Sequence, residues 1–153
     1  MLKAALRFLG SLLVTPLWAE TGEWLIHADG TSHHFHRRDL NERNWGAGLT
    51  YEYNPTETYV WAAEADVFKD SLDDPSGYVG ASWRRRFNYA DLGVIAFVMY
   101  RESARESIGS RVFPGALPFV EFGSRRIRLR TTYIPRVTGK DDEALTFQLL
   151  LRL

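Results

Sequence analysis

The stretch Ala144-Leu145-Thr146-Phe147-Gln148-Leu149-Leu150-Leu151-Arg152-Leu153 decides the fold of this chain. Successive side chains of a β-strand point to opposite faces, so every second residue shares a face. One face would carry only large apolar residues: Leu145, Phe147, Leu149, Leu151 and Leu153. The other face would carry Thr146, Gln148 and Arg152, with Leu150 as the exception. A strand with one wholly apolar face is typical of a transmembrane β-barrel, whose outer face packs against lipid.

The same alternation recurs along the chain in stretches of roughly ten residues, separated by turn-rich segments. It predicts eight strands, at about 22–29, 45–53, 58–68, 77–87, 91–101, 112–122, 125–134 and 144–153. The connectors at 54–57, 88–90 and 123–124 are short, and those at 30–44, 69–76, 102–111 and 135–143 are longer. Short periplasmic turns alternating with long extracellular loops are the rule for outer-membrane barrels. The predicted fold class is therefore all-β: an eight-stranded antiparallel transmembrane β-barrel over residues 20–153.

Residues 1–19 have the layout of a cleaved secretory signal peptide. Lys3 and Arg7 precede the apolar run 8–14, and Ala19 offers a small residue for cleavage. The apolar run is shorter than the ~20 residues that a membrane-spanning helix needs. The alternative is an amphipathic or buried N-terminal helix.

Composition excludes several classes of function. The formal net charge is zero, which argues against nucleic acid as a partner because phosphate binding needs a basic excess. The chain has no cysteine, so disulfides, thiol chemistry and a cysteine zinc site are excluded. The spacing of His33, His34 and His36 could suit a metal, but a solvated loop is favoured because no carboxylate is fixed beside them. No metal and no cofactor is expected.

The predicted barrel interior contains charged residues. Alternation places Arg126, Arg128 and Arg130 inward on the seventh strand. An unpaired buried charge is very costly, so these arginines need acidic partners. The candidates on other strands are Glu52, Glu64 and Asp66. This pattern favours an interior salt-bridge network over a phosphate-binding patch.

An interior cavity for a lipid tail is predicted from the fifth strand. Residues 92–100 are apolar on both faces, and the small residues Gly46, Gly48 and Gly80 would leave space elsewhere. Tight apolar packing without a cavity is the alternative. The floor of such a cavity could be formed by Tyr78, Val79 or Gly80, and alternation favours Tyr78 and Gly80 facing inward.

A hydroxyl, an imidazole and a carboxylate are expected to gather at the extracellular rim of the barrel. His27 lies toward the top of the first predicted strand, and Asp70 and Ser71 lie where the third strand enters its loop. Such a set can activate an acceptor hydroxyl or shuttle a proton.

The sequence also resembles the lipid A palmitoyltransferases of Gram-negative outer membranes (PagP). Asn41-Glu42-Arg43-Asn44-Trp45-Gly46-Ala47-Gly48 is similar to the family's Asn-Glu-Arg-Pro-Trp-Gly-Gly-Gly run. Phe68-Lys69-Asp70-Ser71 and Thr132-Tyr133-Ile134-Pro135 reproduce two further family motifs. The amphipathic helix that precedes the first strand in better-known members has no counterpart in residues 20–22.

The resemblance implies an activity and a site. In the family, the sn-1 palmitoyl chain of a glycerophospholipid moves to a hydroxyl on lipid A, and the residues that match the catalytic His, Asp and Ser are His27, Asp70 and Ser71. Lipid would enter laterally at a gate beside Pro118 and Pro135, because proline cannot donate a ladder hydrogen bond. The family's second gap matches Gly22 and Asn44, which are not prolines.

These features predict a monomeric outer-membrane acyltransferase of a Gram-negative cell, with lipid A and glycerophospholipids as partners and palmitate as the default chain. One alternative is a lipid A deacylase that releases free fatty acid. The other is a non-catalytic small barrel that serves as an adhesin or stabilises the membrane.

Overall fold

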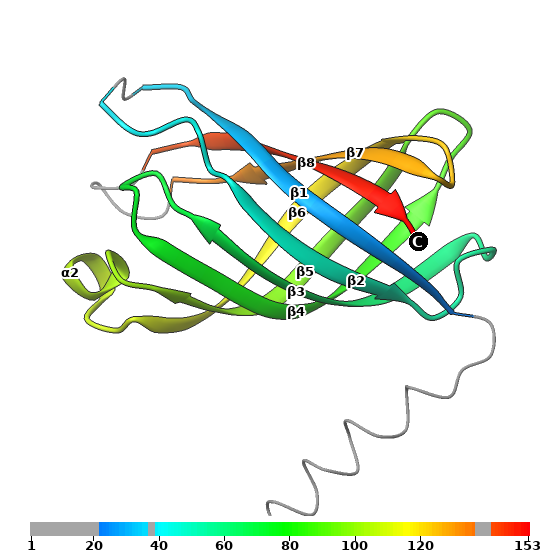
Figure 1. Ribbon diagram of the computed structural model, residues 1–153, viewed down its shortest axis with the longest axis horizontal. Coiled ribbons are helices and arrows are strands. Elements are labelled where there is room, and N and C mark those ends of the chain that lie inside the picture. Colours follow the sequence, from blue (N-terminus) through cyan, green and yellow to red (C-terminus); the bar gives the residue numbers. More distant parts are fainter. Residues whose placement is uncertain (1–21, 37–38, 137–141) are drawn as a thin grey trace, which may run out of the picture.

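The computed structural model describes residues 22–36, 39–136 and 142–153 and shows a closed antiparallel barrel (Figure 1). Its strands are β1 (Glu23–His34), β2 (Gly46–Glu52), β3 (Tyr59–Lys69), β4 (Pro75–Arg86), β5 (Asp91–Arg101), β6 (Val112–Gly123), β7 (Ile127–Ile134) and β8 (Ala144–Arg152). Each strand pairs with its neighbour in sequence, and β1 pairs with β8 to close the barrel. One short helix, α2 (Ala104–Ile108), lies between β5 and β6. The predicted eight-stranded antiparallel barrel is confirmed.

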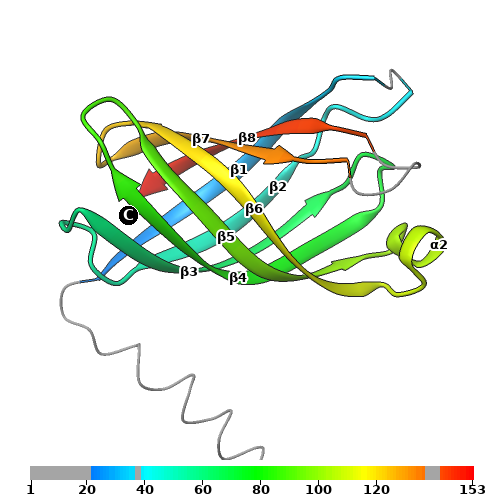
Figure 2. The ribbon, with the colours of Figure 1, turned by 180° about the vertical axis from the view of Figure 1, so that it is seen from behind.

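The two ends of the barrel differ. Segments 35–45, 70–74, 102–111 and 135–143 connect strands at the end that carries α2, which we call the loop end. Segments 53–58, 87–90 and 124–126 lie at the opposite end, the turn end, where β1 begins and β8 finishes (Figures 1 and 2). The predicted signal peptide, residues 1–19, lies outside the described residues. Among the described residues, no helix has the length and apolar character needed to cross a membrane.

The first strand is longer than predicted. Gly30 was expected to begin a loop, but β1 continues to His34 and stays paired with β8. The register shifts between Asp29 and Thr31, which is the signature of a β-bulge. A bulge accommodates an extra residue without ending the strand, and here it carries β1 four residues past Gly30 to the loop end.

The loop between β3 and β4 is shorter than predicted. It spans residues 70–74 instead of 69–76, because β4 already begins at Pro75. A proline is tolerated at the first position of a strand, where its missing N–H breaks no ladder bond. The backbone N–H of Asp70 donates to the carbonyl of Asp74 at 2.9 Å, which closes a tight turn around Ser71.

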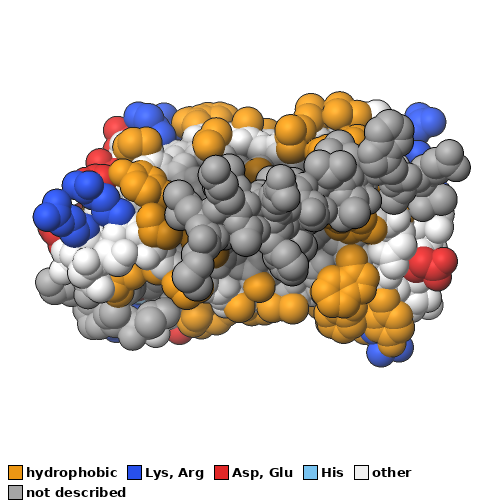
Figure 3. All heavy atoms as spheres, turned by 90° about the horizontal axis from the view of Figure 1, so that it is seen from below, with side chains coloured by type: hydrophobic (Ala, Val, Ile, Leu, Met, Phe, Trp, Pro, Cys, Tyr) orange, Lys and Arg blue, Asp and Glu red, His pale blue; other side chains and the backbone are white. Residues whose placement is uncertain are grey.

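The outer face is apolar between the two ends. Every strand contributes outward-facing large apolar side chains that are 38–69% exposed, among them Trp24, Leu49, Val67, Val79, Val98, Val112, Leu129 and Leu149. On the face drawn in Figure 3 they lie along the barrel, with charged side chains at the two ends. The predicted alternation of β8 is present, since Leu149 faces outward and Gln148 and Leu150 are buried. Leu150 is therefore an inward residue, which explains its break in the pattern.

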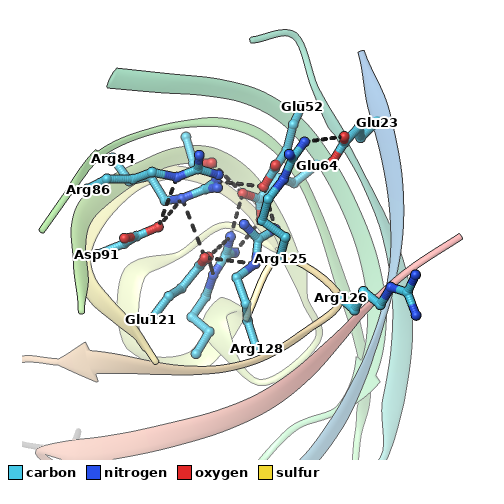
Figure 4. A network of polar contacts seen from close by, with 12 residues as sticks. Glu23, Glu52, Glu64, Arg84, Arg86, Asp91, Glu121, Arg125, Arg126 and Arg128 are labelled. Atoms are coloured by element: carbon cyan, nitrogen blue, oxygen red, sulfur yellow. Dashed lines mark hydrogen bonds and ion pairs between the residues drawn. The ribbon is translucent and has the colours of Figure 1, made fainter. Parts of the chain in front are cut away.

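A charged network fills the interior toward the turn end (Figure 4). Glu52 accepts hydrogen bonds from Arg84 at 2.6 Å and from Arg128 at 2.5 Å. Arg130 binds both carboxylate oxygens of Glu64 at 2.5 and 3.0 Å and donates to Glu121 at 2.8 Å. The predicted salt-bridge network is thus confirmed for Arg128, Arg130, Glu52 and Glu64.

Two members of the predicted network lie elsewhere. Arg126 is exposed in the turn before β7 and points away from the network in Figure 4, so its inward assignment was wrong. Asp66 is buried, but it pairs with His27 instead of an arginine. Glu121 and Arg84, which the sequence did not single out, take part in the network in their place. The seventh strand begins at Ile127, one residue too late for Arg126 to join its inward face.

Candidate active site

A cavity lies inside the barrel between the charged network and the loop end. Its volume is about 140 Å³. Its apolar wall comes from β5 and β6 and includes Ile95, Phe97, Met99 and Leu117. Arg130 and Gln148 lie at its polar side, and Asp70 and Ser71 also line it. The cavity that the apolar fifth strand predicts is therefore present.

The register of the fourth strand determines which candidate floor residues face the cavity. Tyr78 lines it, with its ring 5.9 Å from the ring of Phe97. Val79 faces outward and is 61% exposed, so it does not line the interior. Gly80 faces inward, where a Cβ would come within 3.0 Å of the Phe97 Cβ. Tyr78 and Phe97 therefore line the cavity, and Gly80, the β4 partner of Phe97, leaves room for the Phe97 side chain.

Ser71 is paired with a histidine that the sequence reading set aside. The His34 Nε2 atom lies 3.0 Å from the Ser71 Oγ. His34 is the last residue of β1, and its side chain is only 6% exposed. The expected solvated loop around His33, His34 and His36 was wrong for His34, because the bulged β1 carries this residue into the barrel mouth.

A carboxylate also stands beside these histidines. Asp142 precedes β8, and its side chain is 2% exposed. Its Oδ2 atom lies 3.9 Å from the His34 Nδ1, and its Oδ1 atom lies 3.1 Å from the His36 Nδ1. The backbone N–H of His36 also donates to Asp142 at 3.1 Å. Ser71, His34 and Asp142 therefore stand in the order hydroxyl, imidazole, carboxylate.

Asp70 binds the side chain of Arg101 at the same mouth of the cavity. Its Oδ2 atom accepts hydrogen bonds from Arg101 at 2.7 Å and from Ser103 at 3.0 Å. Its Oδ1 atom accepts the backbone N–H groups of Leu72 and Asp74. Burial alone would raise the pKa of Asp70, but the hydrogen bond from Arg101 and those from the backbone hold this pKa below its ordinary value. The carboxylate stays ionised and holds Arg101 beside Ser71.

His27 occupies a deeper position than expected. It is the fifth residue of β1 and is 2% exposed. Its Nδ1 atom lies 3.1 Å from the Asp66 Oδ2, and its ring covers Gly48, where an added Cβ would clash with it. Within the described part of the chain, none of its hydrogen bonds or ion pairs reaches Asp70 or Ser71. The structure therefore brings Asp70 and Ser71 together at the mouth but leaves His27 in the interior.

The group around His27 could in principle hold a metal ion. His27, Asp29 and Asp66 place ligand atoms within 4.8 Å of one another. Gln148, however, donates to Asp29 at 2.6 Å and to Asp66 at 3.0 Å. These hydrogen bonds occupy one oxygen of each carboxylate, and the Asp29 Oδ2, Asp66 Oδ1 and His27 Nε2 atoms are buried without a hydrogen-bond partner among the described residues. The glycines at 46 and 48 make room for the side chains of Asp29 and His27 instead of widening the cavity.

The backbone pairing between β6 and β7 ends beside the cavity. Backbone pairing of β6 with β7 runs from Gly123/Arg128 to Phe119/Thr132 and stops there. Pro118 is the next residue of β6, and Pro135 follows β7 directly. Within the described residues, 112–118 of β6 have no partner on β7. The predicted lateral gate therefore coincides with a gap in the pairing.

The second gap that the family resemblance predicts would lie between β1 and the segment before β2. In this chain the two segments are joined there by hydrogen bonds. The backbone N–H of Asn44 donates to the carbonyl of Gly30 at 3.2 Å, which a proline could not do. The Asn44 side chain also accepts from Ser32 at 2.5 Å and donates to the Lys69 carbonyl at 3.1 Å. Asn44 thus closes this seam at the loop end.

The mouth of the cavity brings together a hydroxyl, a positive charge and an apolar wall. Ser71 offers a hydroxyl beside a base, Arg101 offers a positive charge, and the apolar wall offers room for a hydrocarbon tail. Sequence reasoning placed Asp70 and Ser71 at this mouth but did not place His34, Arg101 or Asp142 there. The signal available for His34 was its even spacing from Ser32, which places both on the inward face once the strand is extended past Gly30.

The chain is similar to known proteins of one family. A family model described as "Antimicrobial peptide resistance and lipid A acylation protein PagP" matches residues 21–149. A lipid A acyltransferase PagP of Laribacter hongkongensis is 34% identical over 99 residues, 63% of this chain and 48% of that protein. The lipid A acyltransferase PagP of Sodalis glossinidius is 28% identical over 104 residues, 65% of this chain and 54% of that protein. The chain spans about half the length of these curated relatives.

Among solved structures, the crystal structure of Neisserial surface protein A (NspA) is similar, with a TM-score of 0.49 and 13% sequence identity. The match covers 86% of this chain and 95% of that one.

Proposed function

Because the chain belongs to the PagP family, we propose that it is a lipid A acyltransferase of the Gram-negative outer membrane. It moves an acyl chain, palmitate by default, from the sn-1 position of a glycerophospholipid to a hydroxyl on lipid A. The barrel acts as a monomer, and its apolar outer face lies in the membrane.

The observation that carries this proposal is the position of Ser71 at the mouth of an apolar cavity that lies beside an open seam. A phospholipid tail can leave the bilayer through the gap past Pro118 and enter the cavity without passing through water. Its ester bond then lies near the mouth, where Ser71 and His34 stand 3.0 Å apart. Burial of the tail fixes the ester against these groups, which is how a positioned site lowers the barrier to reaction.

Charge at the mouth supports the same reaction. Acyl transfer develops negative charge on the carbonyl oxygen, and a preorganised cation stabilises that charge. Arg101 lines the cavity beside Ser71 and is fixed by the ionised Asp70. Asp70 therefore serves as the residue that positions Arg101. His27 is paired with Asp66 in the barrel interior.

Mass spectrometry of lipid A tests the proposal. A strain that lacks the protein is complemented with wild type, with Ser71→Ala or with Ser110→Ala, an exposed loop serine bonded to the backbone of Val112. We expect wild type and Ser110→Ala to add one acyl chain to lipid A, and Ser71→Ala to reduce this product roughly a hundredfold or more. Loss of a chain from lipid A with wild type would indicate a deacylase. Unchanged lipid A in every strain, with folded barrel in the outer membrane, would leave a non-catalytic barrel.

Chain length gives a second prediction. Tyr78 and Phe97 bound the cavity, so Tyr78→Ala should deepen it and shift the transferred chain toward longer acyl groups. The volume that the removed tyrosine ring occupied would accommodate roughly two to four methylene groups of an acyl chain. Val79→Ala is the matched control, because Val79 faces outward. The readout is the mass of the chain added to lipid A. An equal shift in both variants would contradict the assignment of Tyr78 to the cavity floor.

A further inference from the structure

We propose that the turn end of the barrel holds a second lipid site, which binds the phosphate group of a glycerophospholipid headgroup. The inference goes beyond the proposed acyl transfer and takes from it only the placement of the barrel in a membrane. The site is a polar pocket between the β4–β5 turn (residues 87–90) and the β6–β7 turn (residues 124–126), at the opposite end of the barrel from Ser71. These two turns lie side by side in Figures 1 and 2.

The pocket is larger than the apolar cavity at the loop end, with a volume of about 240 Å³. Three arginines line it: Arg86 at the end of β4, Arg125 in the β6–β7 turn and Arg128 on β7. Two acids, Asp91 and Glu121, also line it and face each other across the β5–β6 ladder. The lining therefore carries more positive than negative side chains.

Arg86 has donors to spare. Its Nε atom lies 3.7 Å from the Asp91 Oδ2, which is too long for a hydrogen bond, and the Arg84 Nε already donates to the same oxygen at 2.9 Å. Within the described residues, the Arg86 guanidinium donates no hydrogen bond. A guanidinium carries five N–H donors in a planar fork that matches the oxygens of a phosphate. Arg86 can therefore donate to a phosphate without breaking an existing hydrogen bond.

Arg125 carries a positive charge that is only partly balanced. Its Nη2 atom donates to the Glu23 Oε1 at 2.7 Å, and the Arg152 Nη2 lies 2.8 Å from the same oxygen. Two arginines thus share one carboxylate. The single negative charge of a phosphodiester would compensate the surplus, and such charge-assisted hydrogen bonds are among the strongest in proteins.

Arg128 has an unsatisfied donor although it is buried. Its Nη2 atom donates to Glu52 at 2.5 Å. Its Nε atom lies 3.3 Å from the Glu121 Oε2, but both atoms are buried and make no hydrogen bond among the described residues. An unsatisfied buried donor is costly, so a ligand oxygen that accepted from this atom would stabilise the site.

Neutral donors complete the pocket. The Ser124 Oγ accepts the backbone N–H groups of Arg126 and Ile127, both at 3.2 Å. These bonds use the lone pairs of the hydroxyl, so its own proton is left to donate to a ligand. Asn88 adds a side-chain amide from the β4–β5 turn. The pocket therefore offers donors from both turns to one acceptor group.

The outer lip of the pocket is aromatic. Phe87 and Phe122 line the pocket, and both face outward with about half of the side chain exposed. Tyr89, which also lines it, is 93% exposed in the β4–β5 turn. Aromatic residues are typical of the level where a barrel meets the membrane–water interface. A bound glycerophospholipid would place its phosphate among the arginines and its tails beside these rings, and a free phosphate would use only the arginines.

NMR titration of the folded barrel in a phosphate-free detergent tests the inference, because it shows which end of the barrel each probe contacts. The probes are dihexanoylphosphatidylglycerol, dihexanoylglycerol, which lacks the phosphate, and inorganic phosphate. We expect dihexanoylphosphatidylglycerol to shift the backbone amide signals of Asn88 and Ser124 with saturation. Dihexanoylglycerol should leave these signals at their original positions. Inorganic phosphate should need a roughly hundredfold higher concentration, because it has no apolar tails to bury against the rings.

Variants matched in charge test the arginines. The double substitution Arg86→Gln and Arg125→Gln should raise the Kd of dihexanoylphosphatidylglycerol roughly a hundredfold, about tenfold for each charged hydrogen bond lost. Arg85→Gln with Arg126→Gln is the control, since Arg85 packs on aromatic rings of the outer wall and Arg126 points away from the network (Figure 4). This control should change the Kd by no more than roughly threefold, because screened surface charges act weakly. The dispersion of the amide signals verifies the fold of each variant.

Three results would overturn the inference. Equal loss of affinity in both double variants would reduce the binding to non-specific charge attraction. Shifts with inorganic phosphate at the concentration that suffices for the phospholipid would show that the pocket takes free phosphate and not a lipid. Shifts confined to the loop end, around Ser71, would show that the lipid binds only in the apolar cavity.

Lipid A from cells separates this inference from the proposed function. In the described structure none of the four substituted arginines lines the apolar cavity, so the variant with Arg86→Gln and Arg125→Gln should still acylate lipid A. Turn-end binding without acylation of lipid A by wild type would support this site and reject the acyltransferase. Acylation by wild type without shifts at the turn end would support the acyltransferase and reject this site.

Discussion

Replacing Arg130 with methionine is expected to lower the free energy of unfolding of the barrel by about 3–5 kcal/mol, the usual cost of breaking a buried ion pair from one side. Arg130 is 1% exposed and binds Glu64 and Glu121, which are also buried. Its guanidinium also lies 4.3 Å from the centre of the Phe119 ring. Methionine fills similar space but leaves Glu64 without its guanidinium partner, and the hydroxyl of Ser82 that also donates to Glu64 carries no compensating charge.

The measurement is denaturant unfolding of the folded barrel in detergent, followed by tryptophan fluorescence. Arg125→Met is the control, since the Arg125–Glu23 pair is exposed at the turn end and such pairs contribute about 0–1 kcal/mol. Adding Glu64→Gln to Arg130→Met should recover part of the loss, because it removes the uncompensated charge. Equal destabilisation by Arg125→Met and Arg130→Met would show that the interior network does not carry the stability assigned to it.

The barrel could be predicted because the period-two alternation is a local property that each strand displays by itself. The inward faces of β4 and β8 followed from the same rule, as Tyr78 and Gln148 illustrate. The presence of an interior salt-bridge network was predictable, because buried arginines require acidic partners. Which arginine pairs with which carboxylate was not predictable. Asp66 was available by alternation, yet it bonds to His27 because the β1–β2–β3 register sets Asp66 beside Gly48, the glycine under the His27 ring.

The site was less predictable because it depends on contacts between segments far apart in the chain. Ser71 meets His34 across 37 residues, and His36 meets Asp142 across 106. No periodic pattern carries such information. The bulge at Asp29/Thr31 was decisive, because Gly30 after an aspartate is typical of a turn. Ending the strand there assigned His34 to a solvated loop and left His27 as the histidine nearest the rim.

Locking the open seam is expected to reduce acyl transfer roughly tenfold or more, since entry of the donor would then limit the reaction. The last paired residues of β6 and β7 are Phe119 and Thr132, so Pro118 and Tyr133 would be the next partners if the ladder continued. Both side chains face outward and are at least partly exposed. The double substitution Pro118→Cys and Tyr133→Cys places two thiols across the gap in a chain that has no cysteine of its own.

Oxidation should join these thiols, and a reductant should release them and restore activity. Ala96→Cys with Ala116→Cys is the control, because these outward-facing alanines are already paired partners on β5 and β6. A disulfide there leaves the open seam unchanged, so acylation should continue. The readout is acylated lipid A formed from phospholipid before and after oxidation, with the disulfide verified by gel mobility. Full activity with a verified disulfide between positions 118 and 133 would show that the donor reaches the cavity by another route. The seam at Asn44 would then be the next candidate route for the donor. The variant Asn44→Pro tests it, because proline cannot donate the backbone hydrogen bond that Asn44 makes to the Gly30 carbonyl.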